Sequence, residues 1–133
     1  MASDKIERFL AVDSFVVVGA STNRQKYGNK VLRCYAQHDK PVVGVNPRAD
    51  EIEGLPCYAS LVHVPGPPRA VSIVAPPAFA QQIVNDAVAT SVSHLWFQTG
   101  SEDAAAIADA EAHGLEVIAY GPCLLVALGF RDV

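Results

Sequence analysis

Residues 15–28 have the sequence FVVVGASTNRQKYG, and this stretch decides the fold class. Its first four residues, Phe15–Val18, form a continuous apolar run of the kind expected for a strand buried on both faces. Gly19 then opens a loop of small and polar residues, and a helix is predicted to begin near Gly28. A buried strand that leads through such a loop into a helix is typical of a parallel α/β sheet.

Strands and helices alternate along the rest of the chain. Further strands are predicted at Val42–Val45, at residues 70–75, at His94–Phe97 and at residues 115–119. Residues 48–69, rich in glycine and proline, are predicted to be irregular apart from a short extended piece at Cys57 and Tyr58. The alternation predicts an α/β fold: one Rossmann-like domain with a five-stranded, mainly parallel sheet and helices on both faces.

The predicted helices have definite ends. The first covers residues 4–10, and the second begins near Gly28 and ends before Pro41. The others run from Pro76 to residue 88, from Ser101 to Gly114, and from Gly121 to Leu128. Proline disfavours helical geometry in the residue before it, which limits the second helix, whereas proline suits a first helical turn. We expect Ser101 to be an N-cap and Gly114 to follow the end of its helix. Residues 1–12 are therefore an N-terminal helix, and residues 13–133 are the core of a single domain.

The composition fits one globular domain. The chain has 133 residues, of which 50 % are apolar and 18 % are charged, and this balance excludes a disordered chain. Its apolar runs are far shorter than the roughly 18 residues of a membrane-spanning helix. Residues 1–10 carry four charges and do not resemble a signal peptide. Three widely spaced cysteines suggest reduced thiols, so we expect a cytoplasmic protein without a membrane partner.

Positive charge is concentrated between Ser21 and Arg48. Six cations and one carboxylate give this segment a formal charge of +5, in a chain whose net charge is −4. A basic segment in an acidic protein favours an anion site over a nucleic-acid surface, which would need a broadly basic domain. A solvated helix face is the alternative. Because the cations begin directly after the first strand, the anion site is favoured.

Ligands of an open parallel sheet bind at the carboxyl ends of its strands, and the loop after the first strand is the main candidate. Small residues let a ligand approach the backbone, while hydroxyls, helix-start amides and two cations suit a phosphate. The loop is neither a G-x-G-x-x-G fingerprint nor a Walker loop, and a plain strand-to-helix turn is the alternative. The candidate residues are Gly19, Ala20, Ser21, Thr22, Arg24, Lys26, Tyr27 and Gly28.

The end of the second strand carries Asn46, Pro47 and Arg48. An enzyme that uses NAD needs a carboxylate here to bind the ribose diol. An arginine without a carboxylate fits better with a ribose that bears an extra phosphate, as in NADP or coenzyme A (CoA). A simple turn, for which Asn-Pro is a common sequence, is the alternative.

Two further segments are predicted to lie at the same edge of the sheet. Ala75, Pro76 and Pro77 present a stiff apolar backbone, and Gln98, Thr99 and Gly100 place two polar side chains and a glycine there. Pro76 and Pro77 also suit a helix start without any ligand. Trp96 is interpreted as core packing.

No catalytic constellation and no metal site are predicted. None of the four histidines has a carboxylate or thiol at triad or metal-ligand spacing, so all four are interpreted as structural or exposed. Cys123 follows Gly121 and Pro122 at a predicted helix start, where a thiol can be reactive. Packing in the core is the commoner role of a free cysteine. Cys34 and Cys57 are expected to be inert.

Several short motifs together resemble the small stand-alone CoA-binding proteins, and through them the N-terminal CoA-binding domain of the succinyl-CoA synthetase α-subunit. The motifs, between Phe15 and Cys123, are Val18-Gly19-Ala20-Ser21 with Gly28, Val45-Asn46-Pro47, Ile52-x-Gly54, Tyr58-x-Ser60-Leu61, Val71-x-Ile73 with Pro76-Pro77, Trp96-x-Gln98-x-Gly100 and Gly114-x-x-Val117. Gly44, where the family often has proline, and Arg69, where an acidic residue is usual, depart from the pattern.

The resemblance implies a Rossmann fold with CoA bound across the strand ends. It implies pyrophosphate at residues 19–22 and Lys26, the 3′-phosphate and adenosine near residues 46–48, and pantetheine near residues 75–77 and 98–100. The phosphohistidine of the synthetases belongs to a domain that does not match this chain.

Three functional hypotheses follow. The first is non-catalytic binding of CoA or a short acyl-CoA by a carrier, sensor or partner subunit, with Cys123 as a candidate thiol near the pantetheine. The second is an NADP-dependent oxidoreductase, although no proton donor is evident. The third is a ligand-free interaction module. The apolar C-terminal helix would either cover the sheet or meet a protein partner, such as a second copy in a homodimer.

Overall fold

The computed structural model describes residues 2–132 of the chain. Its helices are α1 (Ala2–Leu10), α2 (Tyr27–Gln37), α3 (Ala80–Val88), α4 (Ala104–Ala112) and α5 (Leu124–Leu128), with short 3-10 helices η1 (Leu61–His63) and η2 (Pro77–Phe79). Its strands are β1 (Phe15–Val18), β2 (Val42–Val45), β3 (Glu51–Ile52), β4 (Leu55–Tyr58), β5 (Ala70–Ile73), β6 (His94–Phe97) and β7 (Glu116–Ile118).

The strands form one sheet in the order β3-β4-β2-β1-β5-β6-β7. All neighbouring pairs are parallel except β3 and β4, which are antiparallel. The predicted α/β fold with a mainly parallel sheet is therefore confirmed. The predicted number of five strands is wrong, because the segment expected to be irregular contains two more strands.

The two additional strands form a hairpin whose turn depends on two residues in the left-handed region of backbone space. Glu53 has a φ of 53° and Gly54 a φ of 77°. Cys57 and Tyr58, predicted as a short extended piece, belong to β4 and pair in parallel with the end of β2. The hairpin thus extends the parallel sheet beyond β2.

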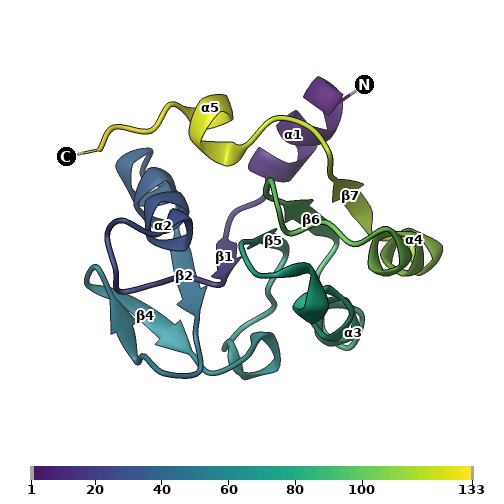
Figure 1. The fold of residues 1–133 in the computed structure, drawn as a ribbon, viewed down its shortest axis with the longest axis horizontal. Coiled ribbons are helices and arrows are strands. Elements are labelled where there is room, and N and C mark those ends of the chain that lie inside the picture. Colours follow the sequence, from purple (N-terminus) through teal and green to yellow (C-terminus); the bar gives the residue numbers. More distant parts are fainter. Residues whose placement is uncertain (1, 133) are drawn as a thin grey trace.

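Helices cover both faces of the sheet. Figure 1 shows α1, α2 and α5 on one side and α3 and α4 on the other. Strand β6 shows why both faces are apolar: Leu95 and Phe97 belong to the core on the α3 and α4 side, while Trp96 between them belongs to the opposite core. Side chains alternate along a strand, so a continuous apolar run serves two cores at once. Trp96 is a core residue, as predicted.

Three helices begin later than predicted. The helix expected from Pro76 is preceded by the separate 3-10 helix η2, so α3 begins at Ala80, and the helix expected from Gly121 begins at Leu124. Asp103, and not Ser101, is the N-cap of α4, and its carboxylate accepts a hydrogen bond from the Ala106 N–H at 2.9 Å. The buried Ser101 hydroxyl instead accepts a hydrogen bond from the Ala75 N–H at 3.2 Å. The predicted end of the helix is confirmed, since Gly114 follows it with a φ of 86°.

The C-terminal helix α5 covers the sheet. Leu124 is buried in the same core as Phe9 and Tyr35, and Leu125 and Leu128 pack against that core. Val126 points outward and is 77 % exposed. The predicted apolar segment is therefore mostly used within the molecule.

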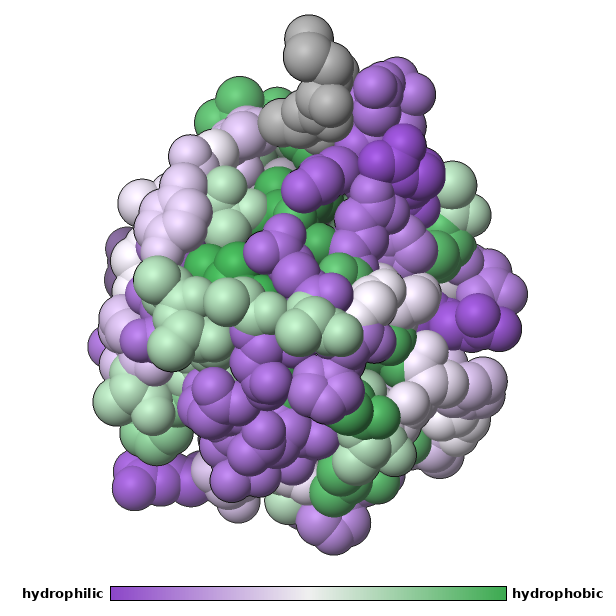
Figure 2. Space-filling view, turned by 90° about the vertical axis from the view of Figure 1, so that its right-hand side faces the viewer, coloured by the Kyte–Doolittle hydropathy of each residue, from purple (hydrophilic) through white to green (hydrophobic). Residues whose placement is uncertain are grey.

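Figure 2 views the molecule from the right-hand side of Figure 1 and shows hydrophilic residues spread over this face, with smaller hydrophobic areas among them. Within residues 2–132, no helix is both long enough and apolar enough to cross a bilayer.

The order of the strands determines where a ligand can bind. From β1 the chain first builds outward through β2 and β4, and then returns to the other side of β1 to add β5, β6 and β7. The point between β1 and β5 where the direction reverses leaves a crevice at the carboxyl ends of the strands.

Candidate functional site

A cavity of about 590 Å³ lies at this crevice. Its volume is within the range of roughly 300–1,000 Å³ that is usual for small-molecule sites. Its wall is formed by residues at the carboxyl ends of β1, β2, β4 and β5, at the start of α2 and on one side of α3. The lining residues are Val18, Gly19, Ala20, Ser21, Lys26, Tyr27, Gly28, Val45, Asn46, Pro47, Ala59, Ser60, Leu61, Val74, Ala75, Pro76, Phe79, Gln82, Ile83 and Asp86.

Two glycines allow the loop after β1 to pack tightly beneath the cavity. Gly19 has a φ of 93°, and a Cβ atom there would lie 1.8 Å from the Val74 carbonyl oxygen. A Cβ atom on Gly28 would lie 2.0 Å from the Gly19 carbonyl oxygen. The start of α2 therefore rests directly on the loop backbone, an approach that no residue with a side chain permits.

The start of α2 has the properties of an anion site. Lys26 is its N-cap residue, and no side chain in the described part of the chain caps this end. The first amide groups of a helix have no partner within the helix, and they lie at the positive end of its dipole. Lys26, Tyr27 and Gly28 all line the cavity, so unpaired amides and a cation meet there.

Two residues that the sequence analysis did not identify hold this loop in place. The buried Asn29 side chain donates a hydrogen bond to the Ser21 carbonyl oxygen at 2.8 Å and accepts one from Arg33 Nε at 2.6 Å. Arg33 also donates to the Arg24 carbonyl oxygen at 3.1 Å. Both residues lie on α2, so the helix fixes the loop from one side.

Asn46 connects the ends of β1 and β2. Its Nδ2 donates to the Ala20 carbonyl oxygen at 2.9 Å, and its Oδ1 accepts from the Arg48 N–H at 2.8 Å. Asn46 therefore acts mainly as a positioning residue, while the adjacent Pro47 lines the cavity. The Arg48 side chain is exposed just beyond this lining.

The predicted site residues divide into two groups. The structure brings ten of them together in the cavity wall, from residues 19–21, 26–28, 46–47 and 75–76. Outside this lining lie Thr22, Arg24, Arg48, Pro77, Gln98, Thr99 and Gly100. Arg24 forms an ion pair with Glu53 at 3.4 Å.

Gln98 is buried beneath α5. Its Oε1 accepts hydrogen bonds from the Leu124 N–H at 2.9 Å and from the Tyr27 hydroxyl at 3.3 Å. Gln98 thus joins β6, α5 and the start of α2. Gln98 itself does not line the cavity, but its hydrogen-bond partner Tyr27 does.

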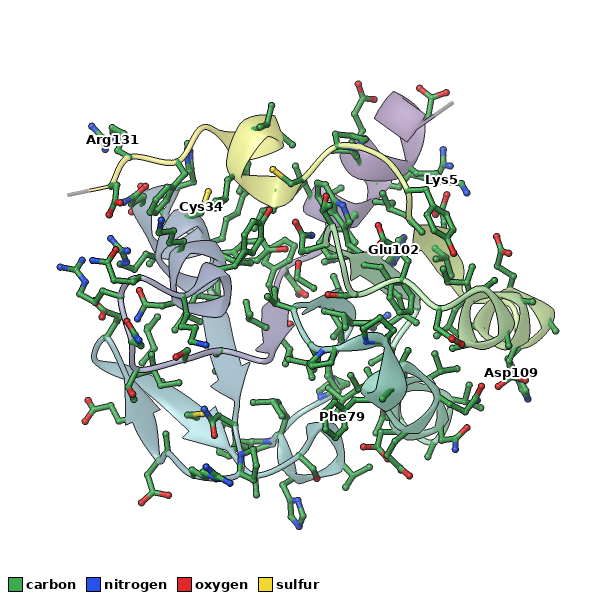
Figure 3. The ribbon with its side chains drawn as sticks, viewed as in Figure 1. Lys5, Cys34, Phe79, Glu102, Asp109 and Arg131 are labelled. Carbon is green, nitrogen blue, oxygen red and sulfur yellow. The ribbon has the colours of Figure 1, made fainter. Side chains whose placement is uncertain are left out.

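Cys123 lies beside this cluster. Burial, and then a hydrogen bond with the Cys123 thiol, raise the pKa of the Tyr27 hydroxyl. Cys123 is half-buried, whereas Cys34 and Cys57 are buried. Burial raises the pKa of Cys34 to about 11 and also raises that of Cys57, which disfavours the thiolate form of both. Figure 3 shows Cys34 on α2 near α5.

The segment after β4 and one side of α3 also contribute lining residues that the sequence analysis missed. Ala59, Ser60 and Leu61 follow directly on β4. Their signal was present in the sequence: if residues 57–58 are a parallel strand, the next residues must lie at its carboxyl end. Phe79 of η2 is 58 % exposed and forms part of the cavity wall, at the position labelled in Figure 3.

The described histidines lie outside the cavity lining. His38, His63 and His113 are exposed, and His94 Nε2 lies 3.3 Å from Glu116 Oε2. Among residues 2–132, no group of three or more histidine, cysteine or acidic side chains is arranged to hold a metal ion.

A parallel sheet with helices on both faces, and a cavity beside an uncapped helix start at the point where its strand order reverses, define a Rossmann-like ligand-binding domain. This chain belongs to the CoA binding domain family, whose family model matches residues 13–129. The predicted resemblance is thereby confirmed, and membership supports CoA binding in general.

Known proteins similar to this chain include stand-alone domains and parts of larger enzymes. A conserved hypothetical protein from Pyrococcus furiosus is 36 % identical with a TM-score of 0.81, and the match covers 87 % of this chain and 99 % of that one. A dinucleotide-forming acetyl-coenzyme A synthetase 1 from Ca. Korarchaeum cryptofilum, solved with phosphate and ADP, is 27 % identical with a TM-score of 0.77. That match covers 86 % of this chain and 27 % of the synthetase.

A further relative is also a larger enzyme that matches this chain over only a small part of its length. An ADP-forming acetate–CoA ligase from Archaeoglobus fulgidus is 31 % identical over 81 residues. These residues are 61 % of this chain but only 12 % of the ligase. The chain therefore corresponds to a small part of that relative.

Proposed function

We propose that the cavity binds coenzyme A or a short acyl-CoA, with the pyrophosphate at the start of α2. The observation that carries this proposal is the uncapped helix end, where Lys26 and the Gly28 backbone line the cavity. Phosphates bind well at such ends because unpaired amides and the helix dipole both favour negative charge.

The ribose 3′-phosphate of CoA is proposed to lie near Arg48. This side chain is exposed next to Pro47, which lines the cavity, and in the described chain it takes part in no ion pair. The end of β2 provides Asn46 where an NAD-binding protein would have a carboxylate. A ligand whose ribose bears a phosphate is therefore preferred to one with a free diol.

The pantetheine arm is proposed to run along Ala75 and Pro76 toward Tyr27. Val74, Ala75 and Pro76 provide an apolar backbone edge on the cavity wall. The hydroxyl of Tyr27 contacts Cys123, so a thiol lies at the end of this path. We propose that Cys123 reacts with CoA disulfide: the Cys123 thiolate forms a mixed disulfide with one CoA, and the other CoA leaves as its thiolate.

The role is proposed to be binding without catalysis. The cavity lining includes no histidine, no cysteine and only one carboxylate within the described chain. A carrier, sensor or partner-subunit role needs only the site described above. Incubation with acetyl-CoA, ADP and phosphate should release no free thiol, and steady release would contradict this part of the proposal.

A lysine substitution tests the proposed phosphate site. Lys26→Ala should weaken CoA binding about tenfold in isothermal titration, because a charge-assisted contact to the pyrophosphate is lost. Lys30→Ala is the matched control: Lys30 lies one turn along the same helix and faces Asp132 at 3.9 Å. Equal effects of both substitutions would contradict the assignment, because they would reflect overall charge.

A further inference from the structure

We propose that Asp86, together with Gln82, recognises the exocyclic amino group of the adenine ring of CoA. This inference rests on the proposed function and deepens it by assigning a specificity-determining residue. Four residues of η2 and α3 line the cavity at positions i, i+3, i+4 and i+7, namely Phe79, Gln82, Ile83 and Asp86. Residues with this spacing share one side of a helix, so α3 presents a continuous wall to the ligand.

The two polar residues of this wall form a pair with a defined orientation. Gln82 Nε2 donates a hydrogen bond to Asp86 Oδ1 at 2.9 Å. One of the two Gln82 amide hydrogens is thereby used, and the other carboxylate oxygen, Oδ2, has no partner among the described residues. The wall therefore offers oxygen acceptors to a ligand.

Charge determines which part of the ligand faces this wall. Asp86 is the one carboxylate, and Lys26 the one cation, among the described residues that line the cavity. A carboxylate repels phosphate and attracts hydrogen-bond donors. The phosphates therefore bind near Lys26, and a neutral, donor-bearing part of CoA lies against α3.

The adenine ring fits this environment best among the neutral parts of CoA. Its amino group presents two N–H donors at the edge of a flat apolar ring. Ile83 lies between the two polar residues in sequence, and Leu61 is a further buried apolar residue of the lining. The ribose hydroxyl adjoins the 3′-phosphate, which the carboxylate repels, and pantetheine has no flat ring to pack against apolar side chains.

A CoA analogue in which hypoxanthine replaces adenine tests the inference, because a carbonyl oxygen then replaces the amino group. Wild-type protein should bind CoA about tenfold more tightly than the analogue in isothermal titration. Asp86→Ala should reduce this preference to about twofold or less. Asp109→Ala is the matched control: its carboxylate also accepts a hydrogen bond from a glutamine, Gln81, at 3.0 Å, but it lies on α4 outside the cavity lining (Figure 3).

The outcomes separate this inference from the proposed function. If wild-type protein binds CoA and the analogue equally well, or Asp86→Ala weakens both by the same factor, the assignment of Asp86 is wrong and CoA binding still stands. If wild-type protein binds neither compound, the proposed function itself fails and the inference fails with it.

Discussion

Two independent structural constraints require glycine at position 19. Its φ of 93° is in the left-handed region, and a Cβ atom would lie 1.8 Å from the Val74 carbonyl oxygen. Gly19→Ala should therefore lower the free energy of unfolding by roughly 2–5 kcal/mol, which combines backbone strain with overpacking. Urea denaturation measures this loss.

Gly100 provides the control for that substitution. Its φ is 91°, but a Cβ atom would meet nothing within 4 Å. Gly100→Ala should cost only the strain, about 1–2 kcal/mol. If both variants lose the same stability, close packing of the loop on β5 is not what requires glycine at position 19.

Arg48 provides a second prediction at the scale of single residues. Arg48→Glu should weaken CoA binding about tenfold and dephospho-CoA binding by less than about twofold, because only CoA carries the 3′-phosphate. Arg69→Glu makes the same charge change at the opposite, amino end of β5. An equal loss for both ligands in Arg48→Glu, measured by titration, would rule out this role.

The sequence predicted most residues near the proposed phosphates but not those that support them. Small residues, cations and helix starts are local features, so the loop after β1 could be identified directly. The contribution of Arg33 depends on the α2 helix placing it against the Arg24 carbonyl oxygen, 3.1 Å away. Gln98 was predicted at the crevice, yet it is buried because α5 folds over it. Such contacts between distant segments leave no pattern in the sequence.

At the scale of elements, α1 is attached to the edge strand β7 by an ion pair. Arg8 donates hydrogen bonds to Glu116, one of them from Nε at 2.8 Å. This hydrogen bond, with smaller contributions from the charges of Arg8, His94 and Lys5, holds the pKa of Glu116 below its ordinary value. A lowered carboxyl pKa in the folded state stabilises the fold above the unfolded pKa, and the contribution disappears as pH falls through the folded value.

Glu116→Gln tests this attachment. At neutral pH the variant should be less stable than wild type, and the difference should shrink as the pH falls from about 6 to about 3. Urea denaturation at a series of pH values measures it. Glu111→Gln, at an exposed glutamate on α4, should show a smaller difference from wild type throughout. If the stability difference between Glu116→Gln and wild type does not change with pH, the ionised Glu116 carboxylate is not what attaches α1 to β7.

The elements themselves were predictable to different degrees. The strands Phe15–Val18, Val42–Val45 and His94–Phe97 have the predicted bounds because glycine, proline or polar residues limit their apolar runs. The third predicted strand ends earlier, at Ile73, where its neighbour β1 also ends and pairing stops. Apart from the extended piece at Cys57 and Tyr58, the β3 and β4 hairpin was missed because Pro56 interrupts its pattern. Pairing of β4 with both β2 and β3 keeps it extended.

At the scale of the whole molecule, the cysteines differ in their surroundings. Cys34 and Cys57 are buried and Cys123 is half-buried. Treatment with CoA disulfide should therefore give a single mixed disulfide, in which the Cys123 thiolate displaces one CoA thiolate. Intact mass measures the adduct, and Cys123→Ser should not form it. An adduct that persists in this variant would place the reactive thiol elsewhere.

One measurement tests the central claim most directly: isothermal titration of CoA, dephospho-CoA, NADP and NAD into the same protein preparation. A CoA site at the start of α2 predicts a dissociation constant for CoA on the order of micromolar. Binding of dephospho-CoA should be weaker, and the two dinucleotides should give no binding heat. Tighter binding of NADP than of CoA would favour an oxidoreductase. No binding of any of the four would contradict the proposed function and favour a ligand-free interaction module.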